Sequence, residues 1–284
     1  MTGWQDAPAG WPDEPTGRLH LRIARRDGRS VVAAQYHRGA LRVLRPHRLD
    51  HSGQVCLVSV NPGGGYLGGD TYLTELDVGP DASLLFTTQA ATKIYRTPTA
   101  PARHHTHVRV AAGGVLEMVP DQVIAYRDAR YDQSMTLELD PAATFVGAEV
   151  VTPGWSPDGT WFSYDQVRLF TSVSVGGRPV VWDNLVLRPH DGDVSGLGAM
   201  EGFSHAGSLL AMDRRVDQAL LDDVHQVADA AVGVRAGLTL VDGPGLLLRA
   251  LGRDTKVVAD LLLDVDALLR DRWFGTARID LRKW

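Results

Sequence analysis

One short segment of the chain is rich in glycine, Asn61-Pro-Gly-Gly-Gly-Tyr-Leu-Gly-Gly-Asp-Thr71. The spacing from Gly63 to Gly68 is that of a phosphate-binding P-loop, but such a loop continues with Lys and Ser or Thr. Here Gly69 and Asp70 follow, and a carboxylate repels phosphate, so we expect no nucleotide at this segment. Two interpretations of Asp70 stay open: a turn carboxylate that accepts backbone N–H bonds, or a side chain that faces a polar interior or a partner.

Histidines gather in a second segment, Arg103-His-His-Thr-His107. On a strand, His105 and His107 would share one face about 7 Å apart, a separation that one divalent ion can bridge. This pair is the strongest local metal signal in the chain, and it raises a cupin-like metal-dependent enzyme as an alternative. A cupin would need a Glu a few residues after the second His, whereas Glu117 comes much later. Exposed histidines on a strand edge are the plainer interpretation.

A polar run follows an apolar strand in the segment Leu84–Arg96. Its polar members are Thr87, Thr88, Gln89, Thr92 and Lys93. The run contains no His and no Gly-x-Ser-x-Gly elbow, so it offers no nucleophile–base pair for hydrolysis. We expect a polar strand edge or loop here.

The elements that must position these residues are mostly short strands. A period of two, clearest over Thr71–Val78, and regularly spaced turns predict strand after strand between residues 19 and 187. The last third changes to helical spacing, with one helix capped by Asp213 and a second over Thr255–Trp273 that stops at Gly275. We predict a mainly β fold, a large β-sheet or β-solenoid-like body with two α-helices in the C-terminal half.

Composition sets the class of protein. The 284 residues carry 29 basic and 34 acidic side chains, a net charge of −5, without the basic excess of a nucleic-acid binder. Cys56 is the only cysteine, which excludes an internal disulfide and a Cys-rich metal cage. No window approaches the ~20 apolar residues that cross a bilayer, and the N-terminus lacks a secretory signal. We expect a cytoplasmic protein whose residues 18–284 form one domain after a loosely ordered lead-in, residues 1–17.

The glycine segment and the polar run together closely resemble the urease accessory protein family UreD, called UreH in some organisms. The most specific block is Asn61–Arg96, where Gly-Gly-Asp, an alternating strand and Thr-Thr-Gln-Ala-Ala-Thr-Lys-Ile-Tyr-Arg follow one another. Leu116–Ile124 and Arg272-Trp-Phe-Gly275 also resemble that family. Around Gly154–Phe162, the family's usual Arg and Glu are absent.

The resemblance implies a urease maturation chaperone and not an enzyme. Such a protein would bind UreF-like and UreG-like accessory proteins and apo-urease, and would help deliver nickel to the urease active site. UreG is the GTPase of the set, so this chain would bind no nucleotide. Residues of the family motif that would serve partners or the motif itself are Gly68, Gly69, Thr87, Thr88, Gln89, Lys93 and Tyr95. A pure interaction scaffold without a metal path, and the cupin-like enzyme that uses His105 and His107, are the alternatives.

Under that role Ni²⁺ would be transient cargo. A protein that hands on Ni²⁺ must release it, and a thiolate cage would bind it too tightly. Scattered carboxylates suit a weak relay, and Asp70 is the first candidate because it closes the Gly-Gly-Asp motif. Glu75 and Asp77 are weaker candidates. The pair His105 and His107 could form a surface Ni²⁺ or Zn²⁺ site.

Overall fold

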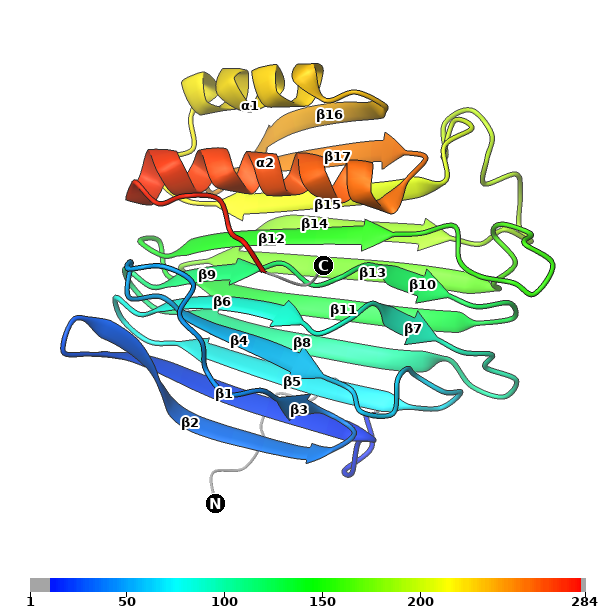
Figure 1. The fold of residues 1–284 in the computed structure, drawn as a ribbon, viewed down its shortest axis with the longest axis horizontal. Helices are drawn as coiled ribbons and strands as arrows, with labels where there is room; N and C mark the ends of the chain where they lie inside the picture. Colours follow the sequence, from blue (N-terminus) through cyan, green and yellow to red (C-terminus); the bar gives the residue numbers. More distant parts are fainter. Residues whose placement is uncertain (1–10, 282–284) are drawn as a thin grey trace.

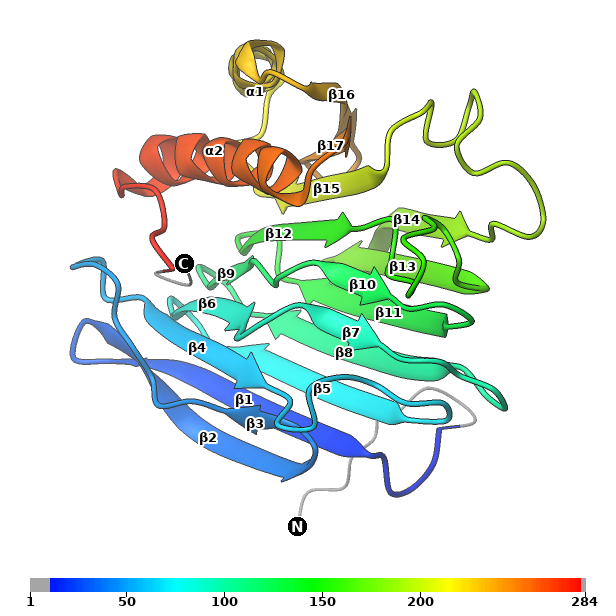
Figure 2. The same cartoon turned by 45° about the vertical axis from the view of Figure 1, so that its right-hand side comes forward.

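The computed structural model describes residues 11–281 of the chain. Two β-sheets lie face to face, and two helices pack on the outer side of one sheet (Figures 1 and 2). The predicted mainly β, solenoid-like body with two late helices is confirmed. Of the predicted lead-in, residues 1–10 lie outside the described residues, and the first strand begins at Gly17.

The first sheet, sheet A, has the strand order β14-β13-β11-β8-β5-β1-β2. Its strands are β1 (Gly17–Arg26), β2 (Arg29–Gly39), β5 (Thr71–Val78), β8 (Ala102–Val110), β11 (Arg130–Leu139), β13 (Gln166–Val175) and β14 (Arg178–Leu187). The five central strands run parallel, and an antiparallel strand closes each edge. The alternation over Thr71–Val78 gave β5 its correct bounds.

The second sheet, sheet B, runs β16-β17-β15-β12-β9-β6-β4-β3, with β7 and β10 attached beside β12. Its strands are β3 (Arg42–Val43), β4 (Val55–Val60), β6 (Ser83–Thr88), β7 (Thr92–Ile94), β9 (Val115–Met118), β10 (Val123–Ala125), β12 (Thr144–Val151), β15 (His205–Met212), β16 (Val234–Val241) and β17 (Gly245–Gly252). From β4 to β13 the chain passes repeatedly from one sheet to the other, as Figure 1 shows. Because parallel neighbours need a crossover, each sheet serves as the crossover of the other.

The two helices are α1 (Gln218–Ala230) and α2 (Thr255–Phe274). The predicted cap of the first helix, Asp213, is wrong. Asp217 caps α1 and accepts a hydrogen bond from the Leu220 N–H at 2.9 Å, while Asp213 is buried at the end of β15 and binds Arg215 and Thr144. The predicted stop is confirmed, because Gly275 takes the left-handed conformation with φ of 62°.

Alternation along the strands separates two apolar cores. One core lies between the sheets, and the second lies between sheet B and the helices. Strand β12 contributes to both, with Phe145 and Val151 between the sheets and Val146 and Val150 under the helices. Both faces of this strand are therefore covered by protein.

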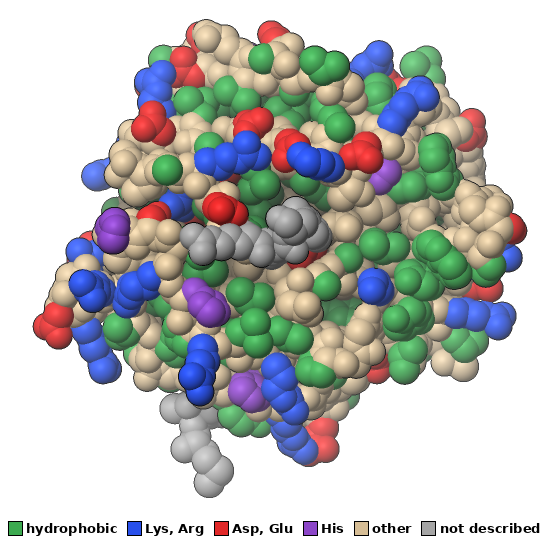
Figure 3. Space-filling model, in the orientation of Figure 1, with side chains coloured by type: hydrophobic (Ala, Val, Ile, Leu, Met, Phe, Trp, Pro, Cys, Tyr) green, Lys and Arg blue, Asp and Glu red, His purple; other side chains and the backbone are tan. Residues whose placement is uncertain are grey.

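Charged side chains of both signs alternate over α2 on the face drawn in Figure 3. Lys256 pairs with Asp260, and Arg278 of the following segment pairs with Asp264 at 2.6 Å. Neither helix of the described residues is long and apolar enough to cross a membrane.

Candidate functional site

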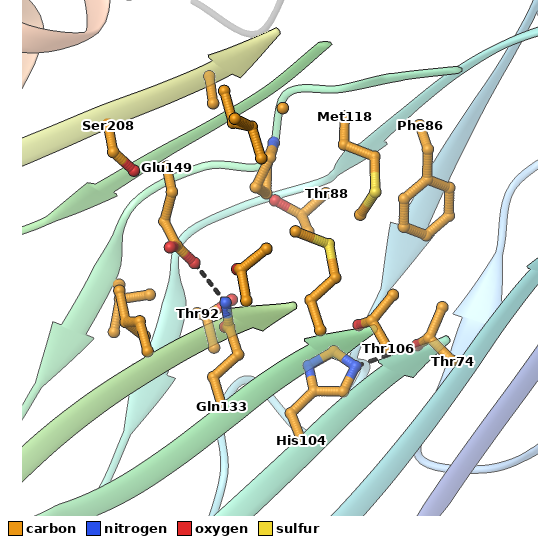
Figure 4. A pocket seen from close by; sticks show the side chains of 18 of the residues that line it. Thr74, Phe86, Thr88, Thr92, His104, Thr106, Met118, Gln133, Glu149 and Ser208 are labelled. Atoms are coloured by element: carbon orange, nitrogen blue, oxygen red, sulfur yellow. Dashed lines mark hydrogen bonds between the residues drawn. The ribbon is translucent and has the colours of Figure 1, made fainter. Parts of the chain in front are cut away.

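A cavity of about 120 Å³ lies between the two sheets. Figure 4 shows its polar lining, in which side chains of sheet A face side chains of sheet B. The polar residues labelled there are Thr74, Thr88, Thr92, His104, Thr106, Gln133, Glu149 and Ser208. Since a water needs roughly 10–15 Å³ of such space and two or more polar partners, the cavity has room for several waters.

Strand parity decides which side chains reach this cavity. On β8, His104 and Thr106 point between the sheets, together with the core residues Val108 and Val110. The neighbouring strand β11 places Gln133 directly beside His104. Parallel register therefore stacks polar side chains from successive strands into one wall of the cavity.

His104 is held as a neutral imidazole in this wall. Its Nε2 lies 3.0 Å from the Thr74 hydroxyl, and its Nδ1 lies 3.4 Å from the Tyr66 hydroxyl. Burial, with a smaller contribution from the charge of His105, lowers the pKa of His104 to about 4. A neutral ring carries one N–H and one acceptor nitrogen, so His104 donates a hydrogen bond to one of these hydroxyls and accepts one from the other.

Glu149 is the acidic group at the centre of the opposite wall. Its carboxylate accepts a hydrogen bond from the Gln133 side-chain amide, which crosses from sheet A. Burial raises the pKa of Glu149 to about 7, against the lowering effects of that hydrogen bond and of the Arg249 charge. The group therefore exchanges its proton near neutral pH, as a site that alternates between proton and cation must do.

The cavity shares part of its lining with a groove on the helix side of sheet B. A groove of about 940 Å³ between α2, the segment 278–281 and sheet B shares Pro120, Asp121, Ala148 and Glu149 with the cavity lining. Asp121 is hydrogen-bonded there to the hydroxyl of Thr88 at 3.2 Å. Carboxylates thus stand both inside the cavity and where it meets the groove.

Asp70 lies apart from this cavity, in the loop between β4 and β5. Its carboxylate accepts bonds from the Leu67 N–H at 2.7 Å, the Tyr72 hydroxyl at 2.9 Å and the Thr16 hydroxyl at 3.2 Å. This is the geometry of the turn carboxylate, the first of the two interpretations made from the sequence. The preceding Gly69 has a φ of 83°, which only glycine adopts without strain.

Glu75 and Asp77 point to the outer face of sheet A. Asp77 binds His20 Nε2 at 3.0 Å and Arg109 Nη1 at 3.1 Å, and these two partners hold its pKa below the ordinary value despite burial. Glu75 is buried in the same face, and burial raises its pKa. Neither carboxylate lines the cavity between the sheets.

His105 and His107 share the outer face of sheet A, as their spacing predicts, with ring centroids 6.5 Å apart. They are buried rather than exposed, and each faces a different partner. His105 Nδ1 lies 2.9 Å from the Ser134 hydroxyl, and His107 Nε2 lies 3.0 Å from Glu138. Within residues 11–281, no three or more His, Cys, Asp or Glu side chains are arranged to hold a metal ion.

The motif residues divide between the cavity and its surroundings. Thr88 lines the cavity, whereas Thr87 turns to the other face of β6 and donates to the Val119 carbonyl. Gln89 is exposed, and Gly68, Gly69, Lys93 and Tyr95 belong to the loop and strand around the glycine segment. A Cβ on Gly65 would lie 2.6 Å from the Tyr95 ring, so the glycine segment packs directly on the polar run.

Sequence reasoning missed His104 and Gln133, and it did not distinguish Glu149 from the other carboxylates at turns and strand ends. The alternation of residues along β8 could have identified His104. It lies an even number of residues from Ala102, Val108 and Val110, so its side chain should face the core with theirs. The spacing of His105 and His107 instead predicted a metal site on the outer face of sheet A. No such signal marks Glu149, because apolar residues occupy both parities of β12.

Comparison with known proteins gives one consistent family. The family described as "UreD urease accessory protein" matches residues 15–284. The chain is 56% identical over 269 residues to the urease accessory protein UreD of Actinomyces naeslundii, covering 95% of this chain and 99% of that protein. It is 50% identical over 279 residues to the protein of the same name from Arthrobacter sp. strain FB24, covering 96% and 95%. A Bacillus sp. TB-90 protein of that name is 36% identical, over 95% and 99%.

Proposed function

The chain belongs to the UreD family of urease accessory proteins, and on that premise we propose that it helps deliver nickel to apo-urease through the cavity between its sheets. The observation that supports this path is the position of Glu149, whose carboxylate lies in the internal cavity and which also belongs to the lining of the groove beside α2. The protein acts in this proposal as a maturation chaperone, not as an enzyme.

The donor set of the cavity suits cargo rather than a resident ion. Carboxylate, hydroxyl and amide oxygens bind Ni²⁺ less tightly than nitrogen and sulfur donors do. The lining offers three carboxylates (Asp121, Glu149 and Asp183), one neutral imidazole and several hydroxyl groups, while Cys56 lies on the other side of sheet B. A cation on such a path is held briefly at each group and passes on.

The proton of Glu149 provides the means of release. A pKa of about 7 allows the carboxyl to lose its proton when Ni²⁺ arrives and to regain it when Ni²⁺ leaves. A carboxylate with an ordinary pKa would stay charged and would retain the cation longer.

Partners complete the proposed role. UreF-like and UreG-like proteins would join this chain on apo-urease, and the UreG-like partner would supply GTP hydrolysis. The division of labour fits the sequence, because the glycine segment has Asp70 where a P-loop has its cation-binding hydroxyl and lacks the lysine.

A Glu149→Gln variant tests the path. Glutamine keeps the shape and one acceptor oxygen but loses the charge, so we expect nickel transfer to apo-urease to slow by about tenfold or more. The measurements are nickel content and activity of urease matured with the complete accessory set. Glu138→Gln on the outer face of sheet A is the matched control and should transfer nickel at the wild-type rate. Wild-type transfer by Glu149→Gln in an intact complex would leave the pure scaffold as the better account.

A further inference from the structure

One cationic side chain stands in the lining of the cavity. Among the described residues of that lining, Arg249 of β17 is the only Lys or Arg. Its guanidinium donates to the carboxylate of Asp183, which comes from β14 in the opposite sheet. The pair therefore joins the two sheets at the side of the cavity where β14 and β17 meet.

Arg249 shares a row of sheet B with Glu149. Glu149 pairs with Ser208, and Ser208 pairs with Arg249, so the three side chains cross β12, β15 and β17 on one face. Two strand spacings, about 10 Å, separate the outer two backbones, a distance that an Arg and a Glu side chain together can span. The Arg249 charge already acts on Glu149 in the present arrangement.

We propose that Asp183 is a positioning residue, which holds Arg249 away from Glu149 and so keeps the cavity open to a divalent cation. The inference rests on the proposed nickel path. Without Asp183, the guanidinium would be free to turn along its row to the Glu149 carboxylate. It would then neutralise the Glu149 carboxylate, so that an arriving Ni²⁺ would find no negative charge at that position.

Three variants separate this role from a structural one. Asp183→Asn releases Arg249 with its charge and should slow nickel transfer by about tenfold, the effect of one ionic contact on an equilibrium. Arg249→Gln removes the obstructing charge and should transfer nickel at least as fast as the wild type. The double variant Asp183→Asn/Arg249→Gln should behave like Arg249→Gln. If the Asp183–Arg249 ion pair served only to hold the two sheets together, both single variants would transfer nickel more slowly than the wild type.

The matched control is a second ion pair between the same regions. Arg178 of β14 lies 3.8 Å from Asp242 in the turn after β16, and both side chains are largely exposed, outside the cavity. Asp242→Asn breaks this pair without freeing a charge into the cavity, so its nickel transfer should equal that of the wild type. Asp183→Glu keeps the carboxylate and should restore most of the transfer lost in Asp183→Asn.

A readout independent of urease activity is the titration of Glu149, followed by infrared spectroscopy of the full-length chain against Glu149→Gln. Asp183→Asn removes a charge that raises the Glu149 pKa and also lets the guanidinium approach, so this pKa should fall, and Arg249→Gln should raise it. In the double variant only the lost Asp183 charge acts, so its Glu149 pKa should lie clearly above that of Asp183→Asn. If Asp183→Asn does not fold, Arg249→Gln still decides, because nickel transfer at or above the wild-type rate supports the positioning role and slow transfer overturns it.

Slow transfer by the double variant, or equal loss in both single variants, overturns the positioning role. The outcome also distinguishes this inference from the nickel path itself. Normal transfer by Glu149→Gln would refute the path. Slow transfer by Glu149→Gln with normal transfer by Asp183→Asn would refute only the role of Asp183.

Discussion

At the scale of single residues, Glu149 makes stability depend on pH. The folded chain holds this proton up to about pH 7, whereas an ordinary Glu releases it near 4.5. As pH rises between these values, the unfolded state gains the ionised form first, so stability falls by at most about 3 kcal/mol and levels off above pH 7.

Glu149→Gln should remove that slope. The free energy of unfolding, measured by denaturant titration from pH 4.5 to 8, should then fall less steeply for the variant than for the wild type. All other titrating groups are common to both proteins, so the difference isolates Glu149. Parallel curves would mean that this carboxyl titrates normally in the folded chain.

Asp70 offers a second residue-scale prediction. The Asp70→Asn variant keeps an acceptor oxygen but loses the charge that strengthens its bonds from Leu67, Tyr72 and Thr16. We expect a loss of about 1–2 kcal/mol of stability. Urease activation should fall only in proportion to the folded protein recovered, as measured by circular dichroism and activity in parallel. Reduced activation per folded molecule would instead place Asp70 on the nickel route.

At the scale of elements, one buried arginine fastens α2 to sheet B. Arg270 donates to Glu117 of β9, to Asp50 at 2.9 Å and to the Ala277 carbonyl at 2.9 Å. Glu117 and Arg270 are both almost fully buried. Close by, Asp266 has no hydrogen-bond partner among the described residues, and burial with the charge of Glu117 raises its pKa well above the ordinary value.

Arg270→Leu should therefore be severely destabilising. It leaves the Glu117 carboxylate buried without its cation, a change that costs about 3–5 kcal/mol. Arg272→Leu on the same helix breaks only the more exposed pair with Asp223 and should cost about 1 kcal/mol or less. Thermal unfolding of the two variants checks the contrast. Similar midpoints would show that the buried pair contributes no more than the exposed one.

The elements also show what the sequence could and could not predict. Alternating residues fixed β5 to its ends, and helical spacing placed α2 within one residue, because each pattern has a single period and one covered face. The cap of α1 was placed four residues early, since Asp213 and Asp217 both precede the same apolar stripe. Only the Thr144 and Arg215 contacts of Asp213 distinguish them.

At the scale of the whole molecule, the cavity could not be predicted because its wall joins residues distant in sequence. Gln133 and Glu149 meet across two sheets, and Asp183 meets Arg249 across 66 positions. These contacts depend on which strands become neighbours in the sheets. The alternation of residues and the turn motifs predict the strands but not their order in a sheet. The family resemblance indicated a role in urease maturation, but of the carboxylates proposed for the nickel route, Asp70 lies in the glycine loop and Glu75 and Asp77 lie on the outer face of sheet A.

The passage of the chain from sheet to sheet has a consequence for how the protein emerges from the ribosome. Each pass adds one strand to each sheet, so from β4 to β13 neighbouring strands of the two cavity walls follow the order of translation. Strand β12, which carries Glu149, is therefore translated before β17, which carries Arg249. A nascent chain would thus present Glu149 before Arg249. Asp183 is also translated before Arg249, so the carboxylate that binds the guanidinium precedes it along the chain.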